Sequence, residues 1–380
     1  MGKVYLSHNN IISSLGFDSP FVIDQISAEV SGLHLVDEPK ILPRPFYASM
    51  IPKEDLDDAF GKLEAESSHT RLEKMLMVSL DKVLKAPEIE LTDRVGLILS
   101  TTKGNIDVLE SESPFPEKRA YLSVLGQTLQ HYFGFVTEPI IVSNACVSGV
   151  LALVTAQRLI DQGKFDHVFV VAGDLVTKFI ISGFNSFQAL SDAPCRPYCA
   201  SRSGINIGEA AASVLVTKDK NRLVAEAVEI LGGASCNDAN HISGPSRTGE
   251  GLFRSISSTL TETGLSPKEI DYISAHGTAT MYNDEMEAIA FDRAGLANTP
   301  LNSLKGYFGH TLGASGLIET IIGMHSLHRN TLFASKGFQT LGVSRPINVI
   351  EKTTPKKLDT FLKTASGFGG SNTAAVFRKP

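Results

Sequence analysis

The chain has 380 residues, of which 42% are hydrophobic and 20% are charged, and its formal net charge is -6. A chain of this length is longer than a domain with one hydrophobic core usually is, so two domains or a duplicated unit are expected. The excess of acidic residues excludes a general attraction to nucleic acid or to anionic membranes. The sequence contains no run of about 20 apolar residues, the length that a helix needs to span a membrane. Four cysteines and the lack of a recognisable signal peptide favour a reducing cytoplasm over a disulfide-rich secreted class.

The first half of the chain alternates between short apolar runs and longer amphipathic stretches. Residues 1–50 have the composition of short strands and loops, and apolar residues at helical spacing predict a helix over 67–85. Residues 191–209 are rich in Pro, Ser and Gly, which predicts a long functional loop. Further strands are expected at 95–100, 140–142, 168–173 and 212–216, and further helices at 119–133 and 146–162.

A charged turn at 218–221 is predicted to separate two halves, residues 1–218 and 219–380. The second half repeats the alternation of strand and helix found in the first. Such alternation predicts an α/β fold in which helices cover sheets rich in parallel strands. The strands expected in this half are 223–234, 271–275, 361–365 and 373–378, and the helices are 247–263, 284–294 and 314–329.

Cys146 lies where a short β-branched run passes into an apolar helix. The free N–H groups and the dipole of a helix start favour a thiolate, and a thiolate is a nucleophile. A cysteine beside an apolar helix is, however, equally often a small core residue. The other cysteines, Cys195, Cys199 and Cys236, lack the spacing of a zinc site and are interpreted as unligated thiols.

Two stretches of the second half carry histidines in a polar setting. In Ser-Ala-His-Gly-Thr-Ala-Thr, His276 ends a predicted strand, a position that faces the ligand crevice in open α/β sheets. In the glycine-rich stretch 302–316, Lys305 and His310 lie near a helix start, and Glu319 follows within the helix. Taken singly, each residue has a structural interpretation, such as a hydrogen-bonded histidine or a solvated charge.

A third stretch, Ser-Gly-Phe-Gly-Gly-Ser-Asn at 366–372, predicts a tight turn. Backbone N–H groups exposed in such a turn can form an oxyanion hole. A glycine-rich turn alone is weak evidence for any function.

Together these stretches resemble the elongating β-ketoacyl-[acyl-carrier-protein] synthases. The order and spacing of the motifs match from about residue 90 onward, whereas the first 90 residues match poorly. A degradative thiolase would carry a second cysteine where Phe368 stands, and an initiating synthase would pair its cysteine with His and Asn. The shared motifs are Ala-Cys at 145–146, His-Gly-Thr-x-Thr at 276–280, Lys-x4-His at 305–310, Gly-Ala-x-Gly-x2-Glu at 313–319 and Gly-Phe-Gly-Gly-x-Asn at 367–372.

The resemblance implies the thiolase fold, in which two similar halves form a five-layer α-β-α-β-α sandwich, and it implies a homodimer. It also implies a decarboxylative Claisen condensation between an acyl group on Cys146 and a malonyl thioester. The N–H groups of Cys146 and Phe368 would hold the oxyanion, and His276 and His310 would donate hydrogen bonds to the enolate.

The resemblance assigns supporting roles to further residues. Lys305 and Glu319 would orient His310 and tune its protonation. Thr278 and Thr280 would bind the phosphopantetheine arm of the carrier. Phe184 and Phe368 would gate the acyl pocket, and neither a metal nor a redox cofactor is expected.

The expected partner is an acyl carrier protein, which is usually acidic. Because this chain is acidic too, docking requires a local basic patch. Arg71 and Lys74 lie three residues apart on a predicted helix and share a face, so they are the predicted docking residues.

Two other functions remain open at this point. A non-condensing partner subunit that sets chain length would resemble a synthase, although such subunits usually lack the cysteine. A scaffold with a vestigial site would also keep the fold. The sequence does not distinguish primary fatty-acid synthesis from a polyene or polyketide pathway.

Overall fold

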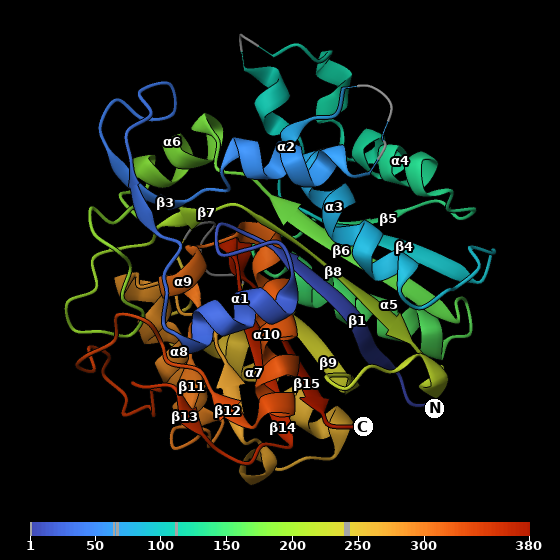
Figure 1. Cartoon of the computed structure of the whole chain (residues 1–380). Coiled ribbons are helices and arrows are strands. Elements are labelled where there is room, and N and C mark those ends of the chain that lie inside the picture. Colours follow the sequence, from blue (N-terminus) through green and yellow to red (C-terminus); the bar gives the residue numbers. More distant parts are fainter. Residues whose placement is uncertain (1, 64, 66–67, 111–112, 239–243) are drawn as a thin grey trace.

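A continuous sheet of ten strands forms the frame of the molecule (Figure 1), and it consists of two five-stranded halves, called here the first and second sheets, that have the same strand order. The computed structural model describes residues 2–63, 65, 68–110, 113–238 and 244–380. The first sheet consists, in spatial order, of β1 (Tyr5–Ile12), β8 (Ala210–Thr217), β6 (His167–Asp174), β4 (Val95–Ser100) and β5 (Ile140–Val142). The second consists of β9 (Val228–Asn237), β15 (Ser371–Arg378), β14 (Thr360–Ser366), β10 (Tyr272–Ser274) and β11 (Leu301–Asn302).

The two sheets repeat one topology. When the strands of each half are numbered along the chain, both sheets have the spatial order 1-5-4-2-3. In both, the first three neighbours pair antiparallel and the last three pair parallel. A short antiparallel junction of β1 with β9 joins them, with Tyr5 opposite Glu229 and Leu6 opposite Val228. The predicted division after residue 218 falls in the connection from β8 to β9.

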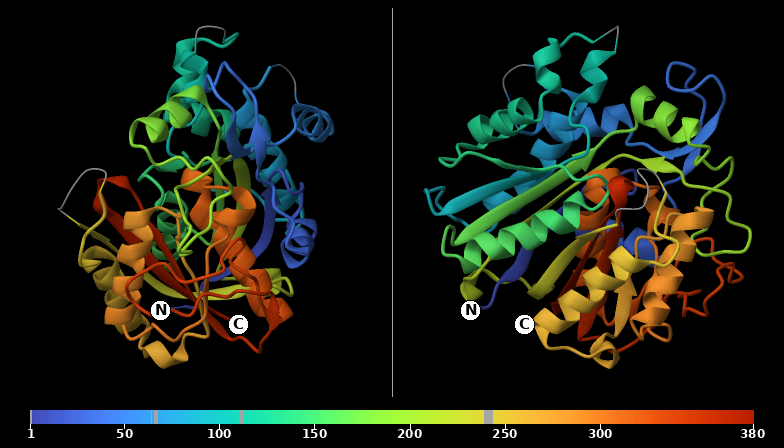
Figure 2. Two further views of the ribbon diagram at one scale, coloured as in Figure 1. Left: turned by 90° about the vertical axis from the view of Figure 1, so that its left-hand side faces the viewer. Right: turned by 180° about the vertical axis from the view of Figure 1, so that it is seen from behind.

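Helices form three layers around these two sheets. Helix α3 (Arg71–Lys85) packs on β8, β1 and β6, and α4 (Leu122–Phe133) lies beside it. Helices α5 (Ser148–Asp161) and α10 (Ser315–Arg329) pack against each other between the sheets. Helices α7 (Glu250–Thr263) and α8 (Met281–Arg293) cover the outer face of the second sheet. The expected five-layer arrangement is confirmed, and Figure 2 shows it from two further sides.

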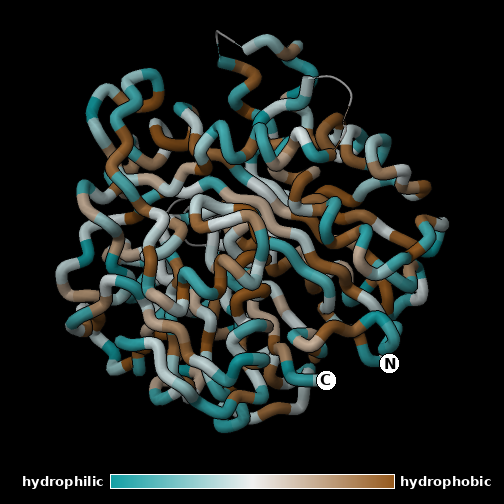
Figure 3. Tube along the Cα trace, in the orientation of Figure 1, coloured by the Kyte–Doolittle hydropathy of each residue, from teal (hydrophilic) through white to brown (hydrophobic). Residues whose placement is uncertain are grey.

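The central layer is apolar on nearly every side. Residues 315–327 of α10 are all buried, and the largest hydrophobic cluster joins this helix to α5 and to strands of both sheets. Figure 3 shows hydrophobic stretches along the inner strands, whereas the outer turns carry most of the hydrophilic residues. Burial from both sides explains why these helices show no polar stripe.

Glycines allow the two central helices to touch backbone to backbone. A Cβ atom on Gly149 would lie 2.6 Å from the backbone nitrogen of Leu317, and one on Gly316 would lie 2.6 Å from that of Val150. Real Cβ contacts are longer, so only glycine fits at this crossing. The starts of α5 and α10 are thereby held together, as are the residues that precede each helix.

The N-terminal region differs from its prediction. Residues 1–50 were expected to form strands and loops, but 19–27 form a helix, α1 (Ser19–Ser27), which Asp18 caps by accepting a hydrogen bond from the Phe21 N–H at 2.9 Å. The remaining helices are α2 (Lys53–Gly61), α6 (Lys178–Ser186) and α9 (Lys305–Phe308), and the short strands are β2 (His34–Val36), β3 (Phe46–Ser49), β7 (Ile207–Gly208), β12 (Thr331–Leu332) and β13 (Thr354–Pro355). Within the described part of the chain, no helix combines the length and the hydropathy needed to cross a membrane.

Candidate active site

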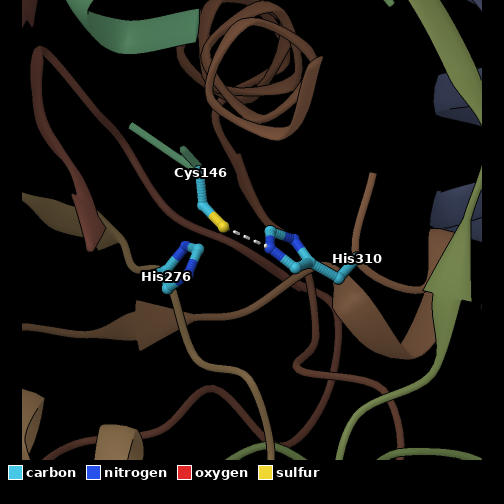
Figure 4. Close-up of side chains that lie close together, drawn as sticks. All are labelled: Cys146, His276 and His310. Carbon is cyan, nitrogen blue, oxygen red and sulfur yellow. Dashed lines mark hydrogen bonds between the residues drawn. The ribbon is translucent and has the colours of Figure 1, made fainter. Parts of the chain in front are cut away.

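The side chains of Cys146, His276 and His310 lie close together and point toward one another, as Figure 4 shows. Cys146 follows β5, His276 follows β10, and His310 lies between α9 and α10. The Cys146 Sγ lies 2.9 Å from the His310 Nε2, and the two imidazole rings lie 5.2 Å apart at 83°. All three side chains are buried. The structure therefore brings together the thiol and both histidines that the motifs singled out.

Cys146 and His310 occupy equivalent places in the two halves. Each lies between the third strand of its sheet and the central helix that follows. Cys146 was expected on the first helical turn, but α5 begins two residues later, at Ser148. Ala145 adopts a φ of 44°, a strained value for a residue with a side chain. Ser148 supports this turn, because its Oγ accepts from the Asn144 N–H at 2.7 Å and donates to the Ala145 carbonyl at 2.6 Å.

The start of a helix was expected to favour the Cys146 thiolate, but the buried setting acts in the opposite direction and favours the thiol. Burial raises the pKa of Cys146 to about 12, although the Lys305 charge and the Phe368 N–H act in the opposite direction. Burial also holds the pKa of His310 well below 6.5, so its imidazole is neutral. The thiol can therefore donate to Nε2, and the His310 Nδ1 lies 3.0 Å from the Ser315 Oγ. This pair is set to transfer a proton when the sulfur attacks a substrate.

Lys305 fixes the other histidine. Its Nζ donates to the His276 carbonyl at 2.5 Å and lies 3.4 Å from the His276 Nδ1. An ammonium group has only donors, so Nδ1 must accept and the imidazole proton must lie on Nε2. Burial, followed by the Lys305 charge, holds the pKa of His276 well below 6.5. His276 therefore offers a neutral N–H donor next to the Cys146 sulfur.

Two buried carboxylates of α8 hold the loop that carries His276. Glu287 accepts hydrogen bonds from the N–H groups of His276 at 2.9 Å and Gly277 at 2.6 Å. Asp284 accepts from the N–H groups of Thr278 at 2.9 Å and Ala279 at 3.2 Å. These hydrogen bonds hold the loop by its backbone N–H groups, so the side chains of His276 and Thr278 are not needed to fix its position.

The predicted pair of Lys305 and Glu319 forms, with Nζ 2.9 Å from Oε1. It was expected to orient His310, but Lys305 contacts His276, and it is Ser315 that contacts the His310 ring. The other Glu319 oxygen lies 2.7 Å from the Nζ of Lys363. Lys363 carries no signal in the sequence, since a single lysine in a strand is ordinarily a surface residue.

Asp174 is a further buried group that the sequence analysis missed. It ends β6 and accepts hydrogen bonds from the Thr101 hydroxyl at 2.9 Å, the Thr102 N–H at 3.0 Å and the Gly313 N–H at 2.7 Å. Gly313 lies in the short 3-10 turn, Leu312–Ala314, that leads into α10, so this carboxylate ties the first half to the start of the helix that follows His310. An aspartate at the end of an otherwise apolar strand was the available signal.

A cavity of about 300 Å³ opens next to the three side chains. Phe184 stacks on Phe368 across it, with ring centroids 5.6 Å apart. The hydroxyls of Thr278 and Thr280, which are 2.9 Å apart, also line it. The lining consists of Cys146, Phe184, Phe187, Ala189, Ile205, Gly244, Pro245, His276, Thr278, Thr280, Tyr282, Asn283, His310, Ser366, Gly367, Phe368 and Gly370.

The glycine-rich turn packs directly against Cys146. A Cβ atom on Gly367 would lie 3.0 Å from the backbone nitrogen of Cys146, and the Phe368 N–H faces the sulfur closely enough to lower the pKa of the thiol. Two backbone N–H groups, those of Cys146 and Phe368, thus lie beside the same sulfur. The other cysteines, Cys195, Cys199 and Cys236, are free thiols outside the cavity lining.

Cys146, His276 and His310 are called here the reactive set. Their donor atoms lie within 4.8 Å of one another, a spacing at which a metal ion has to be considered. Zinc bonded to sulfur at about 2.3 Å and to nitrogen at about 2.0 Å would separate those atoms by roughly 3.5 Å at a tetrahedral angle. The Cys146 Sγ and the His310 Nε2 lie only 2.9 Å apart, which suits a shared proton better than a shared ion. We therefore interpret the set as nucleophilic and acid–base groups.

Arg71 and Lys74 lie on α3 at the predicted spacing, but both are engaged within the chain. Arg71 pairs with the fully buried carboxylate of Glu209 and donates to the Ile51 carbonyl. The Lys74 Nζ lies 2.6 Å from an oxygen of Asp57. Because each cation has an internal anionic partner, the structure gives no support to a carrier-docking patch here, and we do not propose one.

Comparison with known proteins identifies the family. Residues 26–221 match the family described as Beta-ketoacyl synthase, N-terminal domain, and residues 227–339 match Beta-ketoacyl synthase, C-terminal domain. The chain is 30% identical to a putative polyketide beta-ketoacyl synthase 1 of Streptomyces halstedii, over 76% of each protein. It is 26% identical to a putative mitochondrial 3-oxoacyl-[acyl-carrier-protein] synthase of Schizosaccharomyces pombe, over 84% of this chain and 83% of the relative.

Solved structures show the same architecture. A ketosynthase from Xenorhabdus doucetiae, determined in complex with its chain length factor, superposes with a TM-score of 0.87 at 25% identity and covers 100% of this chain and 98% of its own. The family match begins at residue 26, so it includes most of the region in which the motifs alone matched poorly. The chain belongs to the β-ketoacyl synthase family, the condensing acyltransferases of the thiolase fold.

Proposed function

We propose that this chain carries an acyl group on Cys146 and condenses it with a malonyl group on an acyl carrier protein. The products would be carbon dioxide and a β-ketoacyl thioester on the carrier. The observation that carries this proposal is the arrangement of a thiol hydrogen-bonded to one neutral imidazole and flanked by a second, at the wall of a cavity. The substrates would arrive on phosphopantetheine. Because the condensation involves no net oxidation or reduction, it requires no redox cofactor.

The first stage transfers the acyl group to the enzyme. His310 takes the thiol proton at Nε2 while the Cys146 sulfur attacks the thioester carbonyl. The negative charge on the carbonyl oxygen is stabilised by the N–H groups of Cys146 and Phe368. The carrier thiol then leaves with the proton held by His310, so the acyl-enzyme forms with no net change in protons.

The second stage forms the new carbon–carbon bond. The malonyl carbonyl oxygen accepts hydrogen bonds from the Nε2–H groups of His276 and His310, and these strengthen as carbon dioxide leaves and charge moves onto that oxygen. The resulting carbanion attacks the acyl carbon, and the carbon–sulfur bond to Cys146 breaks. One proton restores the thiol. The Ser315 hydroxyl can donate to or accept from the His310 Nδ1, which permits the change of tautomer between the two stages.

The cavity has features that suit both parts of a carrier-bound substrate. The paired hydroxyls of Thr278 and Thr280 would bind the amide groups of the phosphopantetheine arm. The stacked rings of Phe184 and Phe368 line the cavity, and the Phe184 ring lies 6.4 Å from that of His310, where the two would admit the acyl chain. Phe368 is 40% exposed, so its ring has room to move.

The proposed partners are an acyl carrier protein and a second synthase-like chain. The second chain is either another copy or a related subunit, as in the ketosynthase from Xenorhabdus doucetiae that was solved with its chain length factor. The intact set of Cys146, His276 and His310 favours the condensing role for this chain over the non-condensing role. We place the reaction in the cytoplasm and in fatty acid, polyene or polyketide synthesis.

Mass spectrometry of the acylated enzyme tests this proposal. After incubation with an acyl-carrier thioester, peptide mapping should place the acyl mass on Cys146, and Cys146→Ala should abolish both this adduct and condensation. Cys236→Ala is the matched control and should retain full activity, because that side chain lies outside the cavity lining. Acyl mass on another cysteine would contradict the assignment.

A further inference from the structure

Lys363 is a fully buried cation that contacts the backbone of the two residues before His276. Its Nζ donates to the carbonyls of Ser274 at 2.9 Å and Thr364 at 2.6 Å, with a longer contact to that of Ala275 at 3.4 Å. It also lies 2.7 Å from an oxygen of Glu319. Burial lowers the pKa of Lys363, whereas the Glu319 charge raises it, and a set of three carbonyls and a carboxylate, all of them acceptors, favours the ammonium form. A lysine without solvent contact is rare and needs such partners.

Two ammonium groups share one carboxylate at this position. The Lys305 Nζ lies 2.9 Å from one Glu319 oxygen, and the Lys363 Nζ lies 2.7 Å from the other. The group of three therefore has a net charge of about +1 in a buried region where water screens little. Lys305 also donates to the His276 carbonyl, so the two lysines together hold three consecutive carbonyls that end at the reactive residue.

We propose that Lys363 is a positioning residue for the condensation, because its surplus positive charge keeps His276 and His310 neutral. The proposal rests on the roles given to these histidines above. A neutral His310 can accept the Cys146 proton, and a neutral His276 with its proton on Nε2 can donate to the enolate oxygen. An imidazolium at either position would remove the base or disturb the hydrogen bonding of the thiol.

The charges around the histidines agree with this role. For His276, burial lowers the pKa most, followed by Lys305, His310 and Lys363; for His310, the order is burial, Lys305 and Lys363. The Glu319 carboxylate is already shared, and Glu287 makes its hydrogen bonds to backbone N–H groups. Among the described residues, the titratable and charged groups that contact the two histidines or belong to the same network are Cys146, Lys305, Lys363, Glu319 and Glu287, and the two imidazoles also face each other.

A simpler account is that Lys363 only satisfies the Glu319 carboxylate. The two accounts differ in what a charge change does. Lys363→Met leaves the group of three at a net charge of about zero, and Glu319→Gln leaves it at about +2. The double variant Lys363→Met with Glu319→Gln returns it to about +1, the value in the natural chain. Only the positioning role predicts that the double variant regains the natural protonation of the histidines.

Titration of the histidines tests this without any substrate. In the full chain labelled with 13C-histidine, the signals of His276 and His310, assigned by their Asn variants, should titrate about one pH unit higher in Lys363→Met than in the natural chain. The double variant should titrate close to the natural chain. The acid limb of carbon dioxide release from a malonyl-carrier thioester should shift by the same amount.

Two outcomes would overturn the proposal. One is a folded Lys363→Met chain whose histidines titrate as in the natural chain. The other, which also applies if Lys363→Met fails to fold, is a double variant whose histidines titrate no higher than those of Glu319→Gln. If the natural chain releases no carbon dioxide, the proposed function fails, but the titration still decides the role of Lys363.

Discussion

The close contact between the central helices α5 and α10 is predicted to set the distance between Cys146 and His310, and a substitution at this contact tests that prediction. Gly316 lies in the first turn of α10, and a Cβ atom there would meet backbone and side-chain atoms of Val150 at 2.6 and 2.7 Å. The backbone nitrogen of Val150 belongs to α5 and cannot rotate away. Gly316→Ala must therefore push the two helix starts apart, whereas most alanine substitutions in helices are tolerated.

The size of the effect follows from the geometry. Ordinary contact begins at 3.4 Å, so the helices must separate by about 0.8 Å at this point. If the separation reaches the reactive pair, the Cys146 Sγ to His310 Nε2 distance grows from 2.9 Å to about 3.7 Å, beyond the range of efficient proton transfer. We expect acylation of Cys146 to slow by about 100-fold, and the free energy of unfolding to fall by about 1–3 kcal/mol.

The assay is the rate of acyl-enzyme formation by mass spectrometry, together with urea unfolding of the same preparations. Gly61→Ala is the matched control, because Gly61 ends α2 with no heavy atom within 4 Å of the added Cβ position. It should leave both the rate and the stability nearly unchanged. If Gly316→Ala acylates as fast as the natural chain, the helix contact does not set the distance within the reactive pair.

Three further predictions concern charges and protons. His276→Ala should retain acylation of Cys146 but lose carbon dioxide release by about 100-fold or more, whereas His310→Ala should slow both stages; equal effects of the two would contradict their separate roles. Arg71→Ala should lower the free energy of unfolding by about 3 kcal/mol because it leaves the buried Glu209 carboxylate without its cation, and Lys74→Ala, whose partner Asp57 has a side chain that is 40% exposed, should cost less than about 1 kcal/mol in the same urea titration. Finally, burial depresses the folded-state pKa of both histidines, so the unfolded chain binds protons first, and stability present above pH 6.5 should be lost as the pH falls below it. The slope should be about 1.4 kcal/mol per pH unit for each histidine, and His310→Asn should show a shallower slope in unfolding measured across that range.

Strands buried on both faces were predictable because a short, continuous run of β-branched residues favours a strand over a helix or a loop. Predicted strands at 95–100 and 212–216 correspond to β4 and β8 to within two residues. Helix α1 was missed because its nine residues are too few to show a clear period, and only the Asp18 cap and the proline after it indicated a start. Short helices of this kind depend on tertiary contacts more than on local preference.

Motifs were enough to name Cys146, His276 and His310 as candidate site residues, but not to predict their environment. Glycine and histidine at fixed spacing marked Cys146 and His310, whereas the protonation of the thiol depends on burial, which no local pattern reports. Arg71 looked like a surface cation because its partner Glu209 lies 138 residues away in the chain. Lys363 looked like an ordinary strand residue for the same reason, since the carboxylate that accounts for it belongs to α10.

The candidate site residues are divided between the two halves of the chain that share one strand order. The first half supplies the Cys146 thiol, and the second half supplies both of the imidazoles beside it. Only their alignment makes a reaction centre, and that alignment depends on the glycine contact of α5 with α10 and on the short junction of β1 with β9. Neither part of a chain divided between the halves would be chemically complete, so reactivity recovered on mixing the two parts would report their reassembly.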